Sequence, residues 1–347
     1  MSRQLTAIDL FAGAGGATQG LRDSGFRVLA AVENDRDAAS TYRLNHPTVQ
    51  LFEADIRSIK ATRLREQLRL RPRELTLLKV CPPCQGFSSL AEGRAEVDNF
   101  RNDLVGHTIR FVRAFEPAAV LLENVPGLGR DVRSIRLQER LKALGYATRV
   151  YKVNALDFGV PQRRRRLIIL ALRGLRSSDR LPEQLREQGL DGPTSNPTVR
   201  TAFDCLAEAA TEGDPLNVAR SSTPTVKARI RAVPVGGTRF DLPPEHRLAC
   251  HENLDLRGRN ATASYGRLRL DEPAPTMTTR CTTPACGSFI HPTEHRGITL
   301  REAATLQTFP PTYRFSGAYG SVERQIGNAV PVLMAAVLGR TIKALVP

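Results

Sequence analysis

Short apolar segments alternate with amphipathic stretches through the first half of the chain. Apolar runs of this length are typical of buried strands, and the amphipathic stretches have the period of helices. Regular alternation of the two favours an α/β fold, with a doubly wound, mostly parallel sheet that helices cover on both faces. The predicted strands are 5–10, 28–32, 75–80, 118–122, 149–153 and 167–171, and the predicted helices are 17–23, 37–45, 104–115 and 135–144.

The pattern changes at about residue 174, where proline, glycine, serine and threonine become frequent. Long irregular stretches of this kind are typical of a small irregular domain or of long loops. Helical periods remain at 199–209, 299–306 and 321–343. We therefore expect a first domain at 1–173, a smaller irregular domain at 174–320, and a C-terminal helix at 321–347 that returns to the first domain.

Composition narrows the class of protein. Hydrophobic residues make up 41% of the chain and charged residues 24%, as in ordinary globular proteins. No run approaches the roughly 18 apolar residues of a membrane helix, and the first residues do not resemble a signal peptide, so a cytoplasmic location is expected. The net charge of +15 favours a nucleic acid partner, without separating DNA from RNA.

A glycine-rich turn follows the first predicted strand, with Gly13, Gly15 and Gly16 just ahead of a helix. Glycines there allow tight turning and close approach of a ligand to the backbone. Glu33 ends the second strand, and Asp55 and Ile56 follow a third candidate strand. Acids at successive strand ends can bind ribose hydroxyls and an adenine amino group, so the pattern favours a ligand that contains adenosine.

Cys84 follows two prolines after the strand 75–80. A rigid, polar loop favours a reactive thiolate over a buried structural thiol. Cys81 and Cys84 have the spacing of a metal or redox pair, but zinc would need a second such pair, so no metal is expected. Glu123 ends another buried strand, where a carboxylate could exchange a proton with a ligand.

Four arginines occupy 163–166, just ahead of the strand 167–171. Such a run is commonly a solvated phosphate patch. If the arginines enter the strand, alternation would send Arg164 and Arg166 to one face and Arg163 and Arg165 to the other.

Taken in order, these segments resemble the motifs of the bacterial type of cytosine-5 DNA methyltransferases. The match includes the glycine-rich opening, Pro-Pro-Cys-Gln, Glu-Asn-Val and Gln-x-Arg-x-Arg, and it continues at 300–310 and 325–331. It covers roughly 1–172 and 270–345. One departure is Val80-Cys81, where the family usually has glycines.

The resemblance implies a Rossmann-like methyltransferase sheet and a methyl transfer from S-adenosylmethionine to carbon 5 of cytosine. Cys84 would add to carbon 6, and Glu123 would bind ring nitrogen 3. Arg164 would hold oxygen 2 of the base, with Arg166 supporting the pocket. The base must leave the duplex, so base flipping is implied, and 86–103 would be a moving loop. The implied cofactor-binding residues are Phe11, Gly13, Gly15, Glu33, Asp55, Ile56, Leu104, Asn328 and Val330.

The resemblance also makes 1–173 the catalytic and cofactor-binding domain and 174–320 the target-recognition domain. The implied partner is a specific double-stranded DNA sequence, bound by a monomer in the nucleoid, with a cognate restriction endonuclease encoded nearby. The substrate-binding candidates are Gln85, Ser88, Asn124, Arg239, Arg257 and Arg259, the arginines because arginine can read guanine in the major groove.

Three alternatives stay open. A tRNA cytosine-5 methyltransferase of the same fold is one, although its Cys-Phe-Thr signature is absent from the sequence. A catalytically silent DNA-binding relative is another, which the retention of Cys84 and Glu123 disfavours. An amino-methyltransferase would need an aromatic residue where Cys84 follows the prolines.

Overall fold

The computed structural model describes residues 4–83, 104–174, 197–209, 213–248 and 263–346. Its main feature is a seven-stranded sheet of order β3-β2-β1-β4-β5-β8-β6. Five neighbouring strands are parallel, and β8 is antiparallel to both β5 and β6. The predicted fold class is therefore confirmed. The strands are β1 (Thr6–Leu10), β2 (Arg27–Glu33), β3 (Gln50–Glu53), β4 (Leu77–Val80), β5 (Ala119–Asn124), β6 (Tyr146–Asn154) and β8 (Arg165–Arg173).

Alternating side chains of the strands pack into two apolar cores, one on each face of the sheet. In β1, Ile8 and Leu10 belong to the first core and Ala7 to the second, as the period of two in a strand requires. Helices α3 (Ala61–Gln67), α5 (Leu104–Phe115) and α6 (Val132–Ala143) contribute to the first core, while α1 (Gly16–Asp23) and α2 (Arg36–Asn45) contribute to the second. The sequence analysis did not predict α3, whose seven residues bury only Ala61 and Leu64.

The C-terminal segment differs from the prediction, because the single helix expected at 321–343 is two helices. α12 (Tyr319–Asn328) ends before Ala329, and α13 (Val332–Leu345) begins after Pro331. Proline lacks the amide hydrogen that a helix interior needs and disfavours helical backbone in the residue before it. The stretch Tyr319–Leu345 is apolar and long enough to count as a candidate membrane span, but 67% of its most apolar window is buried inside the protein.

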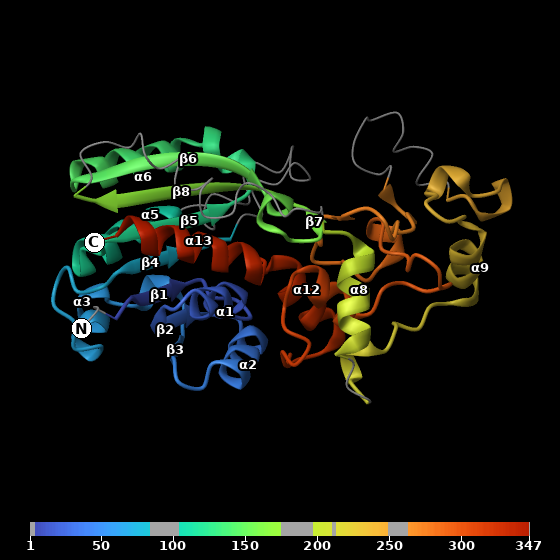
Figure 1. The fold of residues 1–347 in the computed structure, drawn as a ribbon, viewed down its shortest axis with the longest axis horizontal. Coiled ribbons are helices and arrows are strands. Elements are labelled where there is room, and N and C mark those ends of the chain that lie inside the picture. The colour runs from blue at the N-terminus through green and yellow to red at the C-terminus, as the bar shows by residue number, and fades with distance from the viewer. Residues whose placement is uncertain (1–3, 84–103, 175–196, 210–212, 249–262, 347) are drawn as a thin grey trace.

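α13 packs against α1 beside the sheet (Figure 1). A Cβ atom on Gly20 would lie 2.2 Å from the carbonyl oxygen of Val332, so the close approach of the two helices depends on glycine. The last helix thus covers the second core, and its packing places the preceding residue Val330 beside the glycine-rich turn.

The second half of the chain builds an irregular part with its own apolar cores. A two-stranded sheet of β7 (Gln162–Arg163) and β9 (Ala274–Pro275) joins it to the start of β8. Its helices are α8 (Val199–Glu208), α9 (Pro224–Ala232) and α11 (Leu300–Leu306), of which α9 was not predicted. Short 3-10 helices are η1 (Ile56–Ser58), η2 (Pro126–Arg130), η3 (Ala155–Phe158), η5 (Pro215–Asn217), η6 (Arg239–Asp241), η7 (Pro244–His246) and η9 (Pro284–Cys286).

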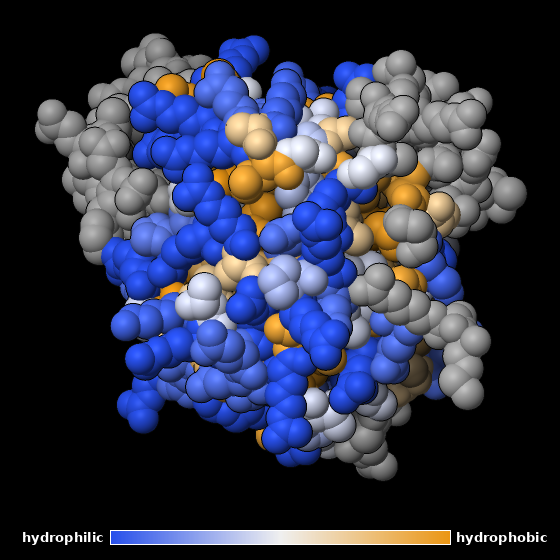
Figure 2. Space-filling view, turned by 90° about the vertical axis from the view of Figure 1, so that its left-hand side faces the viewer, coloured by the Kyte–Doolittle hydropathy of each residue, from blue (hydrophilic) through white to orange (hydrophobic). Residues whose placement is uncertain are grey.

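The direction of the strands identifies the edge that faces this irregular part. In Figure 1, β8 points to the left, away from α8 and α9. Because β8 is antiparallel to β5, the carboxyl ends of the parallel strands point toward α8, α9 and α12. Ligands of open α/β sheets bind at this edge. The opposite side of the molecule is mostly hydrophilic, with only scattered apolar patches (Figure 2).

Candidate active site

Glu123 lies near the carboxyl end of β5, and its side chain is only 6% exposed. Its Oε1 atom forms an ion pair with Nε of Arg166, at 2.9 Å. Its Oε2 atom accepts a hydrogen bond from Sγ of Cys81, also at 2.9 Å. Arg166 comes from β8 and Cys81 follows β4, so the two strands that flank β5 supply the partners of one buried carboxylate.

Asn124, next along β5, holds the chain that leads to Cys84. Its Nδ2 atom donates to the carbonyl oxygen of Pro82 at 3.0 Å, and its Oδ1 atom accepts from the amide of Val125 at 2.8 Å. The side chain is 2% exposed. The predicted nucleophile Cys84 and the predicted substrate-binding residues Gln85 and Ser88 lie outside the described residues. The described chain that leads to them, up to Pro83, already runs beside Glu123.

The four arginines divide as alternation requires. Arg163 and Arg165 are exposed, Arg164 is buried, and Arg166 is largely buried. The two inward-facing arginines do different things, however. Arg166 pairs with Glu123, whereas the amino nitrogens of Arg164 donate to three backbone carbonyl oxygens, those of Met277 at 2.8 Å and of Gly327 and Ala329 at 3.1 Å each.

Arg164 therefore ties the start of β8 to the segment after β9 and to the end of α12. Its expected contact with oxygen 2 of the base stays a prediction. Gln162, which the sequence analysis did not single out, reinforces the same junction. It donates to the Oε1 atom of Gln307 at 3.0 Å and accepts from the amide of Met277 at 2.9 Å.

The glycine-rich turn lies between β1 and α1, and Glu33 at the end of β2 closes it. The amide of Gly13 donates to Oε2 of Glu33 at 2.7 Å. Burial raises the pKa of Glu33, while hydrogen bonds from the amides of Asp35, Gly13 and Asn34 oppose the shift. Gly13 has a φ of +56°, and no atom of the described residues lies within 4 Å of the position that a Cβ would occupy. The turn thus leaves open space beside a carboxylate.

Gly15, two residues on, is packed instead of open. A Cβ there would lie 2.6 Å from Nε2 of His46. The hydroxyl of Tyr313 also donates to the carbonyl oxygen of Ala14, at 2.6 Å. The turn is therefore supported from the end of α2 and from the segment after α11, and within the described residues its Gly13 side has open space for a ligand.

The remaining candidate cofactor residues, Phe11, Ile56, Leu104, Asn328 and Val330, differ in their surroundings. Phe11 and Leu104 pack against the first core, to which Ile56 belongs. Val330 packs with Ala17 of α1 and Ala335 of α13, and Asn328, at the end of α12, is exposed.

Asp55 caps η1, and its hydrogen bonds from the Arg57 side chain lower its pKa to about 2. It is therefore ionised at neutral pH. A void at Gly13, two carboxylates at adjacent strand ends and an apolar wall fit a ligand that combines ribose with a flat, partly apolar ring.

Two side chains of β4 and its end were missed by the sequence analysis. Lys79 is the only charged residue of β4 and is 3% exposed. A single charge within an otherwise apolar strand is the sequence signal that could have identified it. Cys81 was considered only as a metal or redox partner. The described cysteines, 81, 205, 281 and 286, are free thiols, and among the described residues no group of three metal-binding side chains occurs.

Arg239, one of the predicted DNA contacts, is buried in the structure, and its contact with DNA stays a prediction. Its side chain is 5% exposed, because η6 packs it inward and its amide donates to the carbonyl oxygen of Ser264 at 3.1 Å. The neighbours that do face solvent are Val235, 78% exposed, and Phe240, 53% exposed. Arg257 and Arg259 lie outside the described residues.

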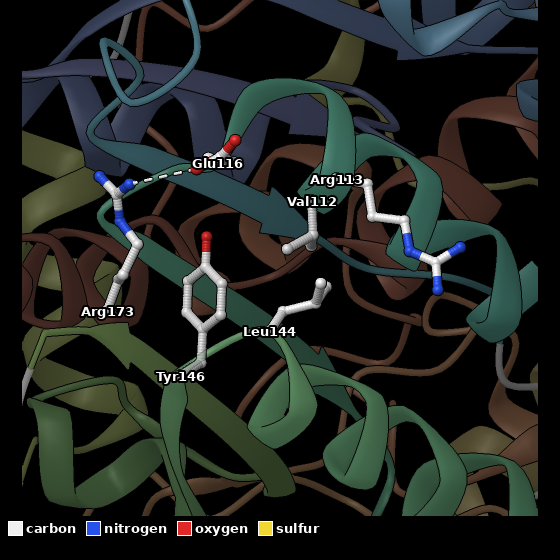
Figure 3. Close-up of a pocket in the computed structure, with 6 residues that line it drawn as sticks. All are labelled: Val112, Arg113, Glu116, Leu144, Tyr146 and Arg173. Carbon is white, nitrogen blue, oxygen red and sulfur yellow. Dashed lines mark ion pairs between the residues drawn. The ribbon is translucent and has the colours of Figure 1, made fainter.

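Two pockets lie away from the Glu123 edge. One, of about 270 Å³, is lined by Val112, Arg113, Glu116, Leu144, Tyr146 and Arg173 (Figure 3). It lies at the amino end of β5, where Glu116 and Arg173 form an ion pair of 3.7 Å. The other, of about 460 Å³, lies between α8, α11 and α13 and is mostly apolar. Neither pocket contains Glu123 or Glu33.

Comparison with solved structures identifies the class of protein that has this fold. A DNA modification methyltransferase encoded within an E. coli prophage superposes with a TM-score of 0.68, at 25% identity over 98% of this chain and 99% of that one. The Dnmt2 methyltransferase of S. pombe, 16% identical over 98% of each chain, has the same fold with a TM-score of 0.67. The fold is that of the Rossmann-like methyltransferases.

The chain belongs to the C-5 cytosine-specific DNA methylase family, whose profile matches residues 5–344. It is 34% identical to the Type II methylase M.HgiDII of Herpetosiphon aurantiacus, over 97% of this chain and 94% of the relative. It is 30% identical to the Type II methyltransferase M.AgeI of Thalassovita gelatinovora, over 98% of this chain and 99% of that relative. The chain is a DNA (cytosine-5-)-methyltransferase, and its family depends on S-adenosylmethionine. The tRNA-modifying and silent alternatives are not favoured.

Proposed function

We propose that this chain methylates a flipped-out cytosine within one double-stranded DNA sequence, with Cys84 as the covalent nucleophile. The observation that supports it is the buried Glu123 carboxylate, which Arg166 and Cys81 hold beside the chain leading to Cys84. Cysteine, carboxylate and guanidinium then meet at the carboxyl edge of the sheet, where a base could be bound.

The chemistry follows from the weakness of carbon 5 as a nucleophile. Addition of the Cys84 thiolate at carbon 6 pushes electrons toward ring nitrogen 3 and makes carbon 5 enamine-like. Glu123 stabilises the proton on nitrogen 3, and Arg166 stabilises charge on oxygen 2. We assign this last role to Arg166 in place of Arg164, because the Arg164 amino nitrogens already bind three carbonyl oxygens.

Carbon 5 would then bond to the methyl group as the bond between that methyl group and the sulfur of S-adenosylmethionine breaks, which leaves S-adenosylhomocysteine. Water would accept the proton that leaves carbon 5, and elimination would return the thiolate of Cys84. S-adenosylmethionine supplies the electrophilic methyl group when it is bound. Of the residues here, Glu33 would bind the ribose hydroxyls and Asp55 the adenine amino group, with Phe11 and Ile56 against the ring. Gly13 and Gly15 would line the turn, and Leu104, Asn328 and Val330 would complete the wall.

We further assign 1–173 to catalysis and cofactor binding, 174–320 to target recognition, and 321–347 to closing the first domain. The charge of +15 suits a phosphate backbone. The names of the relatives support a role in a bacterial restriction–modification system, with a cognate endonuclease encoded nearby. In the cell, the protein would act on DNA as a monomer in the cytoplasm.

Trapping with a modified base tests the proposal. The methylated sequence is first identified by bisulfite sequencing of DNA from a methylation-free host that expresses the chain. A duplex with 5-fluorocytosine at that position should then give a denaturation-resistant complex, because fluorine cannot leave carbon 5 as a proton. The complex should require S-adenosylmethionine, vanish in Cys84→Ala and persist in Cys81→Ala. Trapping that Cys81→Ala abolishes and Cys84→Ala does not would reverse the assignment, and trapping on RNA alone would refute the DNA substrate.

A further inference from the structure

Cys81 occupies the junction between the proposed base and cofactor sides of the site. Its Sγ atom donates to Oε2 of Glu123 at 2.9 Å. Its side chain also packs against the small apolar cluster that contains Val330. Its amide donates to the carbonyl oxygen of Leu10 at 3.2 Å, which extends the pairing of β4 with β1 by one residue and fixes where the thiol lies.

Cys81 is also the point at which this chain departs from the pattern that it otherwise resembles, which usually has glycine there. Glycine has no side chain and cannot donate to Glu123. This chain therefore adds a donor to a carboxylate that already has a guanidinium partner. A thiol is a weak donor to a neutral acceptor, but an ionised carboxylate strengthens any hydrogen bond it accepts.

The charges around Glu123 come from three strands. Arg166 of β8 faces Oε1, and Cys81 faces Oε2. Burial of Lys79 of β4 lowers its pKa, but its neighbours Asp9, Cys81 and Glu123 together more than offset that effect, so the pKa is raised overall. Of these groups, Arg166 and Cys81 contact the carboxylate directly, one at each oxygen.

We propose that Cys81 is a positioning residue, whose thiol fixes one oxygen of Glu123 while Arg166 fixes the other. This rests on the role assigned to Glu123 under the proposed function. The terminal torsion of a glutamate is broad and roughly two-fold, so a carboxylate with a single partner samples orientations that do not face the base. Each oxygen has a second lone pair, so both can still accept from the substrate. Pre-orientation of this kind acts on the chemical step and leaves substrate affinity unchanged.

Three substitutions at one position test the idea. Cys81→Ala and Cys81→Gly remove the donor, and each should slow single-turnover methylation of the target duplex roughly tenfold. Cys81→Ser keeps a donor of similar reach and should stay within about threefold of the original rate. The dissociation constants for duplex and S-adenosylmethionine should change by less than about twofold in all three, and Cys205→Ala, at an exposed thiol, serves as the matched control.

A double-mutant cycle separates this proposal from the one on which it rests. If Cys81 acts through Glu123, then Cys81→Ala should add little to the defect of Glu123→Gln. A Cys81→Gly enzyme at the original rate, or a Cys81→Ser enzyme as slow as Cys81→Gly, would overturn the positioning role. So would a full tenfold loss in the Glu123→Gln background. Full activity of Glu123→Gln alone would refute the role of Glu123 itself and with it that of Cys81.

Discussion

Lys79 and Asp9 form a buried ion pair across the middle of the sheet. They face each other in the register of β4 and β1, with Nζ and Oδ1 2.7 Å apart and side-chain exposures of 3% and 0%. The other oxygen of Asp9 accepts from the hydroxyl of Thr18 at 2.8 Å, and that hydroxyl meets the hydroxyl of Tyr42 at 2.9 Å. A polar chain therefore runs from β4 to α2 directly beneath the glycine-rich turn.

Replacing Lys79 with methionine should destabilise the protein by about 3–5 kcal/mol, because it leaves the Asp9 carboxylate buried without its cation. Urea unfolding at neutral pH measures the loss. The double variant Lys79→Met with Asp9→Asn removes both charges and should recover part of the stability. A single variant as stable as the original protein would show that the pair is not coupled to folding.

His46 should make the protein less stable in mild acid. Burial lowers its pKa to about 4, with a further contribution from the charge of Arg22. Its Nδ1 atom meets Nη1 of Arg22 at 3.0 Å, so a neutral ring with Nδ1 as acceptor fits the site. The unfolded chain binds a proton near pH 6.5, so stability is complete above that pH and falls toward pH 4.

The loss from His46 should be about 2 kcal/mol at pH 5. His46→Gln should therefore flatten the pH dependence of the free energy of unfolding between pH 7 and pH 5, whatever it does to stability at pH 7. Urea titrations of both proteins at the two pH values give the comparison. An unchanged slope in the variant would contradict the assignment of a neutral, buried imidazole.

Arg164 and Arg166 should fail in different ways when each is changed to lysine. A lysine at 164 cannot reach three carbonyl oxygens with a planar fork, so Arg164→Lys should lower the melting temperature by several degrees. Arg166→Lys should leave it nearly unchanged but slow methylation roughly a hundredfold. Thermal unfolding and single-turnover rates distinguish the two. The reverse outcome would return the base contact to Arg164.

Gly13 and Gly15 form a second matched pair. Gly13→Ala would place a methyl group in open space, and Gly15→Ala would place one against His46 and Tyr313. Both residues have positive φ, which costs about 1–2 kcal/mol for alanine. Beyond this shared cost, Gly13→Ala should weaken S-adenosylmethionine binding at least roughly tenfold if the void is the ligand site. Gly15→Ala should mainly lower stability.

Calorimetric titration and thermal unfolding measure the two effects for the glycine variants. The difference between the two variants is the informative quantity, because both carry the same backbone strain. A Gly13→Ala protein that binds S-adenosylmethionine as tightly as the original would show that the void lies outside the cofactor site.

The sequence determined which residues could share an edge. Strand-ending positions such as Glu33 and Glu123 were recognisable because apolar runs stop there, and the parallel arrangement brings such ends together. The period of two in a strand also separated Arg164 and Arg166 from Arg163 and Arg165. The break before α13 was signalled by Pro331, although hydrophobicity alone joined the two helices. These features depend on a residue and its near neighbours in the chain.

The partner that each of these residues meets depends on how distant segments of the chain pack together. Arg164 and Arg166 face the same way, yet one binds carbonyl oxygens more than 100 residues further along the chain and the other binds Glu123. The contact of Cys81 with Glu123, the pairing of Lys79 with Asp9 and the burial of Arg239 are of the same kind. Periodicity fixes the face on which a side chain lies, whereas its partner depends on packing between segments that local sequence does not encode.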